Sequence, residues 1–260
     1  MTVWEAVILG FVQGATEFLP VSSSGHLVIA QSLMGTVVPG VLFEVGVHMA
    51  TLLSILIVYR ARIGKLVTGV VERDRQALAY VGVLVAATVP IVAVGALAME
   101  QIESLFEAPM VSGVALLVTG VALWSSRHAI ARGTIERPAL TAAVLIGLAQ
   151  ACALVPGISR SGTTVVAALW LGVYAEEAAA FSFLMAVPAI AGAAVLQIPN
   201  LGSVTAVGVV PLMAGCVVAA ITGVLAIRAF VGMLDKRAFH LFAPYCWVVG
   251  TAFVSYLWLQ

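Results

Sequence analysis

The chain has 260 residues, of which 62% are hydrophobic and 9% are charged, and its formal net charge is zero. Soluble domains carry roughly 25% charged residues, so this composition excludes a water-soluble globule. The apolar runs are long and lack the alternation of barrel strands, which indicates helices that cross a bilayer. The sequence therefore predicts an all-α polytopic membrane protein. Its expected partners are the bilayer and a lipid, with no nucleic acid.

The first apolar stretch, Val3–Gly35, is broken midway by a polar segment. Gln13 and Glu17 are four residues apart, so they share one face of a helix, and Pro20 ends that helix. A carboxylate in an apolar setting is expensive unless it pairs with a cation or a metal. Three serines that can expose hydroxyls follow Pro20, and His26 comes next; the serines are Ser22, Ser23 and Ser24.

Six further apolar runs have about the ~20 residues needed to cross the hydrocarbon of a bilayer. The expected spans are Phe43–Tyr59, Ala77–Met99, Met110–Ser125, Ala178–Gln197, Val204–Ile227 and Leu241–Leu259. A second stretch, Leu140–Gly172, is broken midway as the first one is.

The cations predict how the chain lies in the membrane. Eleven of the 12 Lys and Arg residues lie in three loops. The loops hold Arg60, Arg62, Lys65, Arg73 and Arg75; Arg127, Arg132 and Arg137; and Arg228, Lys236 and Arg237. If both broken stretches enter and leave on the same side, all three loops share one side, which the positive-inside rule makes the cytoplasm. Both termini and the acidic loop Glu100–Glu107 then lie outside. Full crossings would divide the basic loops, so re-entrant hairpins are favoured.

Arg160 is the remaining cation, and it lies within the second break, Leu154–Gly162. An Arg at membrane depth costs roughly 2.5–3.5 kcal/mol on insertion scales, and such residues usually serve a site or pathway. The alternative is a snorkelling Arg near a helix end. The Pro, Gly and hydroxyl residues around it favour a site.

The two broken stretches align without a gap at a constant offset of 137 residues. The matched pairs are Gly10 with Gly147, Gln13 with Gln150, Ser22 with Ser159, Ser24 with Ser161, Gly25 with Gly162, Val28 with Val165 and Gly35 with Gly172. This predicts one membrane domain, 1–260, with internal repeats at approximately 1–137 and 138–260. Three crossings follow each hairpin, and three is odd, so the repeat is inverted in topology. In such folds the site forms near the midplane, where broken helices meet.

The two breaks together supply what phosphate chemistry needs. Helix N-termini bind anions, and the fork of Arg160 matches the geometry of phosphate. His26 is a candidate nucleophile or proton-transfer group, and Ser23 is the alternative nucleophile, with His26 or Glu17 as its base. The second break adds the hydroxyls of Ser159, Ser161 and Thr164. We expect Ser22, Ser24 and Ser161 to cap helices before they do chemistry.

Three motifs make the chain resemble the undecaprenyl-pyrophosphate phosphatase family, also called the bacitracin-resistance family. They are TEFLPVSSSGHL within Gln13–His26 and its flank, FEV at Phe43–Val45, and PGISRSGTT at Pro156–Thr164. The resemblance implies six crossings plus two re-entrant hairpins, and hydrolysis of undecaprenyl pyrophosphate to the monophosphate used again in cell-wall synthesis. It implies catalytic roles for Glu17, Ser23, His26 and Arg160. Substrate-binding roles are expected for Gln13, Ser22, Ser24, Ser159, Ser161 and Thr164.

The resemblance also implies a divalent cofactor, Mg²⁺ or Ca²⁺, and a site in the plasma membrane that opens toward the periplasm or exterior. Many members of the family have Glu where this chain has Gln13. That leaves Glu17 as the metal ligand of the first break, and we expect the ion to be held mainly by the substrate's diphosphate. The alternative function is a polyprenyl-phosphate flippase or transporter, because inverted repeats with midplane breaks are common in transporters. Whether the chain forms a homodimer stays open.

Overall fold

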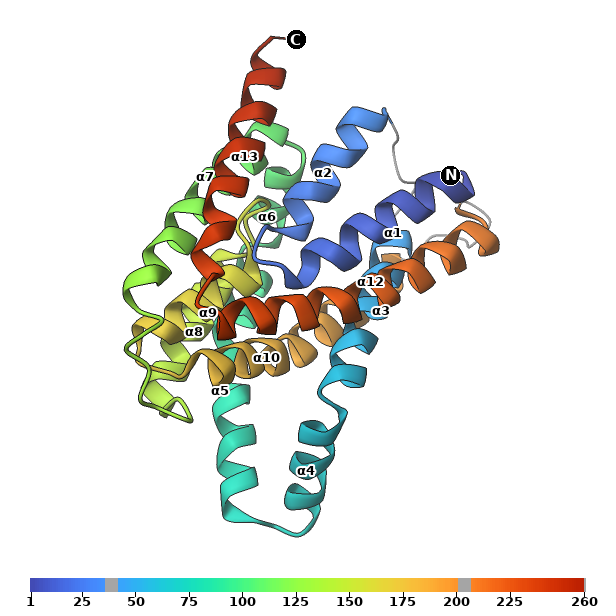
Figure 1. Ribbon diagram of the computed structural model, residues 1–260. Coiled ribbons are helices and arrows are strands. Elements are labelled where there is room, and N and C mark those ends of the chain that lie inside the picture. The colour runs from blue at the N-terminus through green and yellow to red at the C-terminus, as the bar shows by residue number, and fades with distance from the viewer. Residues whose placement is uncertain (36–41, 201–206, 260) are drawn as a thin grey trace.

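The computed structural model describes residues 1–35, 42–200 and 207–259, and within these ranges the chain is helical and contains no β-strand (Figure 1). The α-helices are α1 (Val3–Phe18), α2 (Ser23–Met34), α3 (Leu42–Val58), α4 (Arg60–Val71), α5 (Arg75–Leu97), α6 (Met99–Phe106), α7 (Pro109–Ser125), α8 (Leu140–Cys152), α9 (Arg160–Trp170), α10 (Ala175–Leu196), α12 (Val209–Asp235) and α13 (Phe242–Trp258). Short 3₁₀ turns are η1 (Ser126–His128), η2 (Ile198–Asn200) and η3 (Phe239–Leu241). The all-α fold class is confirmed.

Five helices in the described ranges are long and apolar enough to cross a membrane. They are α5, α7 extended to His128, α10, α12, and α13 extended back to Phe239. A sixth span results if α3 and α4, which meet at a bend of 79°, are counted as one broken crossing. The protein is therefore a multi-pass membrane protein, and the expected spans correspond to α3, α5, α7, α10, α12 and α13.

The structure corrects three expected boundaries. The basic loop after Tyr59 is mostly helix α4, and the acidic loop Glu100–Glu107 is mostly helix α6. Helix α12 continues past Ile227 to Asp235, because one cation, Arg228, does not interrupt a helix whose next residues are again apolar. The beginning of the expected span Val204–Ile227 lies outside the described residues.

Helix α4 is ordered by contacts that the apolar pattern does not reveal. Asp74 caps α5 by accepting a hydrogen bond from the backbone of Ala77 at 2.9 Å, which turns the chain so that α4 packs back on α5. Arg62 Nη1 donates to Glu177 Oε1 at 2.9 Å, and Nη2 donates to the other oxygen and to Tyr80. This ion pair ties α4 to the start of α10 in the second half of the chain.

The two broken stretches form helical hairpins, α1–α2 and α8–α9, and each packs on the other half of the chain. Helix α1 lies along α12, and α8 lies along α5. Gly10 and Gly147, which the repeat matches, make these approaches possible. A Cβ at Gly10 would lie 2.3 Å from the backbone oxygen of Gly215, and one at Gly147 would lie 2.3 Å from that of Ala87. The pairings agree with a repeat, and its inverted orientation stays a prediction.

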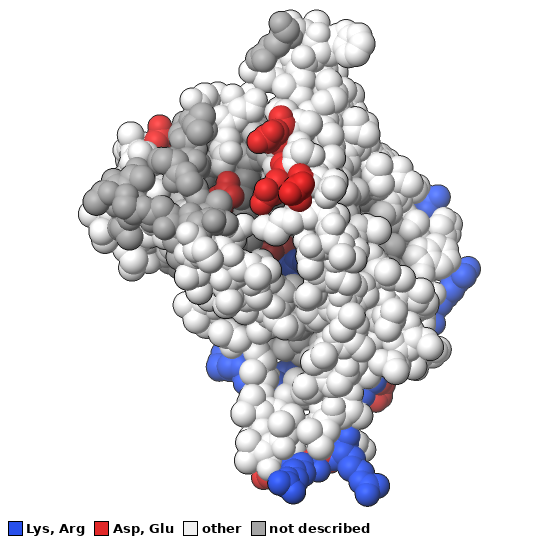
Figure 2. Space-filling model, turned by 180° about the vertical axis from the view of Figure 1, so that it is seen from behind, with Lys and Arg blue, Asp and Glu red and all other residues white. Residues whose placement is uncertain are grey.

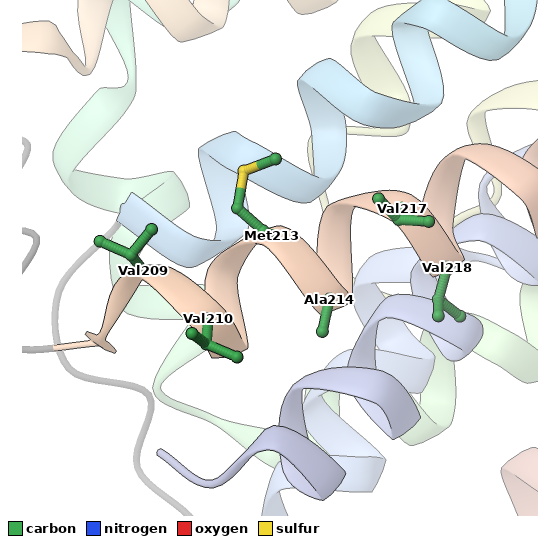
Figure 3. A pocket seen from close by; sticks show the side chains of 6 residues that line it. All are labelled: Val209, Val210, Met213, Ala214, Val217 and Val218. Atoms are coloured by element: carbon green, nitrogen blue, oxygen red, sulfur yellow. The ribbon is translucent and has the colours of Figure 1, made fainter.

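Charge is divided over the surface. Figure 2 shows Lys and Arg side chains at the lower end and along one margin of the molecule, while the largest group of Asp and Glu lies in the upper half. Figure 3 shows an apolar depression along the first half of α12, lined by Val209, Val210, Met213, Ala214, Val217 and Val218. Because its lining carries no polar side chain, this surface suits lipid chains and offers no chemistry.

Candidate active site

The two hairpins meet at their breaks. A Cβ at Gly25 would lie only 3.0 Å from the Cα of Gly157, so the first turn of α2 lies directly against the loop that precedes α9. Ser161 Oγ donates to the backbone oxygen of Leu19 at 3.3 Å, which links α9 to the end of α1. Thr119 of α7 holds the second break by donating to the backbone oxygen of Gly157 at 2.8 Å. Residues from both motifs therefore lie at one place.

Each break begins its second helix with a serine cap. Ser22 Oγ accepts from Gly25 N at 3.3 Å, and Ser159 Oγ accepts from Gly162 N at 3.1 Å. Ser24 and Ser161 are not caps, because their hydroxyls instead pair with those of Ser22 and Ser159, at 3.2 and 3.3 Å. The expectation of a cap is confirmed for Ser22 and wrong for the other two. The caps are Ser22 and Ser159, two residues before Ser24 and Ser161, because a capping side chain must precede the backbone N–H groups from which it accepts.

Glu17 is the centre of the site, and it accepts hydrogen bonds from both hairpins. Ser23 Oγ donates to Glu17 Oε2 at 2.6 Å, and Gln13 Nε2 donates to the same oxygen at 3.0 Å. Arg160 Nη2 donates to Glu17 Oε1 at 2.7 Å. The side chains of Glu17 and Arg160 are 5% and 14% exposed, so this is a buried ion pair between the two halves. The structure thus brings together Gln13, Glu17, Ser23 and Arg160.

Two polar side-chain atoms at this ion pair lack a hydrogen-bond partner in the part of the chain that the structure describes. Arg160 Nη1 and Gln13 Oε1 are buried and have no hydrogen-bond partner among the described residues. Buried polar groups normally have a partner, so an exception needs a reason. One guanidinium nitrogen is thus bonded to Glu17, and the other has donors that an anion at this point could occupy.

His26 lies on the same helix as Ser23, and its two nitrogens have partners elsewhere. Nδ1 lies 2.8 Å from the backbone oxygen of Ser22, and Nε2 lies 2.9 Å from the hydroxyl oxygen of Tyr245 in α13. Tyr245 stands in neither motif, so sequence reasoning missed it. Only the tertiary fold brings α13 to the first hairpin.

His48 is a second residue whose place the sequence left open. Its Nε2 lies 3.9 Å from Glu17 Oε2, and its Nδ1 lies 2.7 Å from the backbone oxygen of Glu44. Glu44 and His48 are four residues apart on one face of α3, and the imidazole contacts the backbone of Glu44. The Glu44 carboxylate instead accepts from Gln31 at 3.4 Å. His48 therefore belongs to the surroundings of Glu17.

Thr164 lies apart from the ion pair. Its hydroxyl donates to the backbone oxygen of Arg160 at 2.7 Å and lies 2.6 Å from the Ser182 hydroxyl of α10. These contacts fix the first turn of α9, and with it the direction of Arg160. The residues expected to touch substrate thus divide into side chains near Glu17, helix caps with their partners, and Thr164, which braces α9.

The side chains of the site do not form a metal centre by themselves. The described part of the chain contains no group of three or more His, Cys, Asp or Glu residues placed to hold a metal ion. Among the described residues, Glu17 is the carboxylate that binds Ser23 and Arg160, and its oxygens already accept three hydrogen bonds. These residues fit an ion only if a ligand brings most of the remaining oxygen atoms.

The chain matches known proteins over almost its whole length. The family model described as bacitracin resistance protein BacA matches residues 6–252. A protein of Desulforapulum autotrophicum named undecaprenyl-diphosphatase is 37% identical, over 96% of this chain and 96% of that protein. Proteins of the same name from Methanobrevibacter smithii and Alcanivorax borkumensis are each 38% identical, the first over 96% and the second over 98% of both chains.

Proposed function

The chain belongs to the bacitracin resistance protein BacA family, and from this membership and its site we propose that it is an undecaprenyl-diphosphatase. The reaction hydrolyses undecaprenyl diphosphate to undecaprenyl phosphate and phosphate, and so recycles the carrier lipid of cell-wall synthesis. The observation that carries the proposal is the buried Glu17 carboxylate, which holds a hydroxyl and a guanidinium from the two halves at one point.

We propose Ser23 as the nucleophile and Glu17 as the group that takes its proton. Ser23 already donates to Glu17 Oε2 at 2.6 Å, a distance suited to transfer. The serine oxygen forms a bond to the terminal phosphorus, and the bond from that phosphorus to the bridging oxygen breaks, which releases undecaprenyl phosphate. Arg160 Nη1 donates to the oxygens of the transferred phosphate, where charge must be stabilised. The sequence left His26 and Glu17 as candidate bases for Ser23, and the hydrogen bond from Ser23 to Glu17 favours the carboxylate for this first step.

His26 enters in the second step. Water attacks the phosphorus of the phosphoserine and gives a proton to His26 Nε2. The bond to Ser23 breaks, and the serine oxygen recovers its proton from Glu17. This order makes phosphoserine the covalent intermediate. Trapping a phosphohistidine at His26 during turnover would contradict it.

We propose a divalent cofactor, Mg²⁺ or Ca²⁺, for which Glu17 would be the protein ligand and the substrate's diphosphate would supply most of the remaining oxygen atoms. When bound, such an ion offsets negative charge on the phosphate oxygens. Because Glu17 is a single carboxylate, we expect the protein without substrate to bind the metal ion weakly. Calorimetry with the metal alone measures this affinity. Gln13→Glu adds a second carboxylate one helical turn from Glu17 and should tighten that binding. Strong binding by the unchanged protein, or full activity in excess chelator, would refute the shared ion.

We propose that the protein lies in the plasma membrane with the basic end of Figure 2 in the cytoplasm and the site open to the periplasm or exterior. Cysteines placed at Ser104 of α6 and Thr68 of α4, both exposed, test this orientation. In intact cells an impermeant thiol reagent should label the first and not the second. Cys152, which is exposed, is first replaced by alanine to remove background. The reverse labelling pattern would invert the orientation.

The decisive experiment measures phosphate release from undecaprenyl diphosphate by the purified protein in detergent. The wild type should release phosphate, and Arg160→Ala should not. A flippase or transporter would need no hydrolysis, so binding of the lipid without phosphate release would favour that alternative. Detergent removes the two compartments that transport requires, and therefore isolates the chemical step.

A further inference from the structure

The contact between His26 and Tyr245 joins the first hairpin to the last helix of the chain. The ring of Tyr245 stacks on that of His26 at an interplanar angle of 7°, with centroids 5.7 Å apart. Its hydroxyl oxygen lies 2.9 Å from Nε2, although the two residues are 219 positions apart in the sequence. The tyrosine therefore fixes both the plane of the imidazole and the surroundings of one nitrogen.

These contacts define the tautomer of His26. The backbone oxygen of Ser22 can only accept, so the Nδ1 atom that lies 2.8 Å from it carries the hydrogen. A neutral imidazole then has its lone pair on Nε2, and the Tyr245 hydroxyl donates to that lone pair. His26 is thus held with its proton-accepting nitrogen toward Tyr245.

His26 is also placed beside the proposed nucleophile. Ser23 and His26 are three residues apart at the start of α2, so their side chains lie on one face of the helix. Among the described residues, Ser23 bonds to Glu17 while His26 bonds to Ser22 and Tyr245. The two proton-transfer groups of the site are therefore separate, and each has its own support.

We infer that Tyr245 is a positioning residue for the phosphatase reaction and acts through His26; this inference rests on the proposed function. Before the second step, the Tyr245 hydroxyl donates to Nε2 and holds the ring in place. The Nε2 lone pair can take the proton of the attacking water once the hydroxyl has rotated its hydrogen away; the phenol oxygen then accepts from the new N–H, since a phenol serves as donor or acceptor. One contact thus supports both protonation states of His26.

The first test examines the contact without turnover, by NMR of protein with ¹⁵N-labelled histidine in detergent. Tyr245→Phe keeps the stacked ring and removes the hydroxyl, so the Nε2 resonance of His26 should move toward that of an imidazole nitrogen with no donor. Tyr256→Phe is the matched control, because Tyr256 lies on the same helix and stacks on Phe253. An unchanged His26 resonance in Tyr245→Phe would overturn the inference.

The second test separates positioning from packing by kinetics. Tyr245→Phe should lower kcat by roughly tenfold and leave KM near the wild-type value, a part of the 10²–10⁴-fold that a positioned proton-transfer group contributes. Tyr256→Phe should change neither constant. A Tyr245→Phe variant with wild-type kcat, or with only KM raised, would refute the role of Tyr245 alone. A wild-type protein that releases no phosphate would remove the proposed function, and the inference with it.

Discussion

The two hairpins share their helix starts and differ in the side chains that carry chemistry. In each, a serine caps the second helix and pairs with the serine two residues later. At three other matched positions the halves diverge: Glu17 corresponds to Leu154, Ser23 to Arg160, and His26 to Thr163. The shared positions determine the backbone, and the divergent ones supply the proposed reaction.

This divergence gives the site one carboxylate and one guanidinium, which pair with each other. If the two halves were identical, each would bring the same charge to the point where they meet, or neither would bring any. Like charges in an apolar setting are unfavourable, so an ion pair requires the halves to differ. The comparison indicates that the repeat provides the geometry of the site, whereas its departures from symmetry provide the side chains of the proposed reaction. Substitutions at the divergent residues and at the shared ones test these two contributions separately.

Removing the carboxylate should have the largest effect. Glu17→Gln should abolish phosphate release, and it should also destabilise the protein by about 3–5 kcal/mol, because Arg160 is left buried without its partner. Activity assays and thermal unfolding in detergent measure the two effects.

The double variant Glu17→Gln, Arg160→Gln provides the control for that experiment. Its stability should lie closer to the wild type than that of Glu17→Gln, because neither charge is left unpaired, while its activity should stay absent. If the double variant is less stable than Glu17→Gln, the ion pair does not explain the loss.

Changing the guanidinium should have the next largest effect, on activity more than on stability. Arg160→Lys keeps a charge that can pair with Glu17 but cannot bind Glu17 and phosphate with two separate nitrogens of one fork. By analogy with arginine fingers, turnover should fall by roughly 10³-fold. A lysine variant with near-normal turnover would reduce Arg160 to a structural charge.

The matched glycines test the shared geometry. Gly10→Ala and Gly147→Ala each place a Cβ 2.3 Å from a backbone oxygen of another helix, so each should cost about 1–3 kcal/mol of stability. Gly95→Ala has nothing within 4 Å and should leave thermal unfolding unchanged or slightly raised. A large effect at only one matched glycine would show that the halves pack differently.

Replacing the two capping serines by glycine should change the stability of the protein by slightly different amounts. Ser22 has a φ of 69°, whereas Ser159 has an ordinary φ of −76°. Ser159→Gly loses the capping side chain and should cost a few tenths of a kcal/mol. Ser22→Gly loses the same cap but relieves the positive φ, so it should be neutral or stabilising. Equal shifts in unfolding temperature would argue against strain at Ser22.

Much of this arrangement follows from the sequence because its causes are local. Apolar length predicted the long helices, and helix-breaking residues predicted the two breaks. The four-residue spacing of Gln13 and Glu17 predicted a shared helix face, which their hydrogen bond confirms. Arg160 was expected to serve a site because a lone cation in apolar sequence needs a reason, and the structure gives it Glu17 as partner.

What the sequence did not predict depends on contacts between distant segments. Tyr245 and His48 reach the site through packing of α13 and α3, and neither has a local pattern that identifies its partner. Helix α4 was expected as a loop because cations separate its apolar residues, and the ion pair of Arg62 with Glu177 that ties it to α10 is equally non-local.

The distance in sequence between Glu17 and Arg160, 143 residues, has a consequence for biosynthesis. At about 5–20 residues per second, the ribosome completes the second motif roughly 7–30 s after the first has emerged. During that interval the nascent first hairpin has a carboxylate and no cation to pair with it. The hairpin must therefore wait at the insertion machinery, remain near water, or carry a protonated Glu17. Final closure of the polar centre is thus a late, post-insertion event, and a ribosome stalled before Arg160 should display a membrane intermediate whose first hairpin is not yet seated.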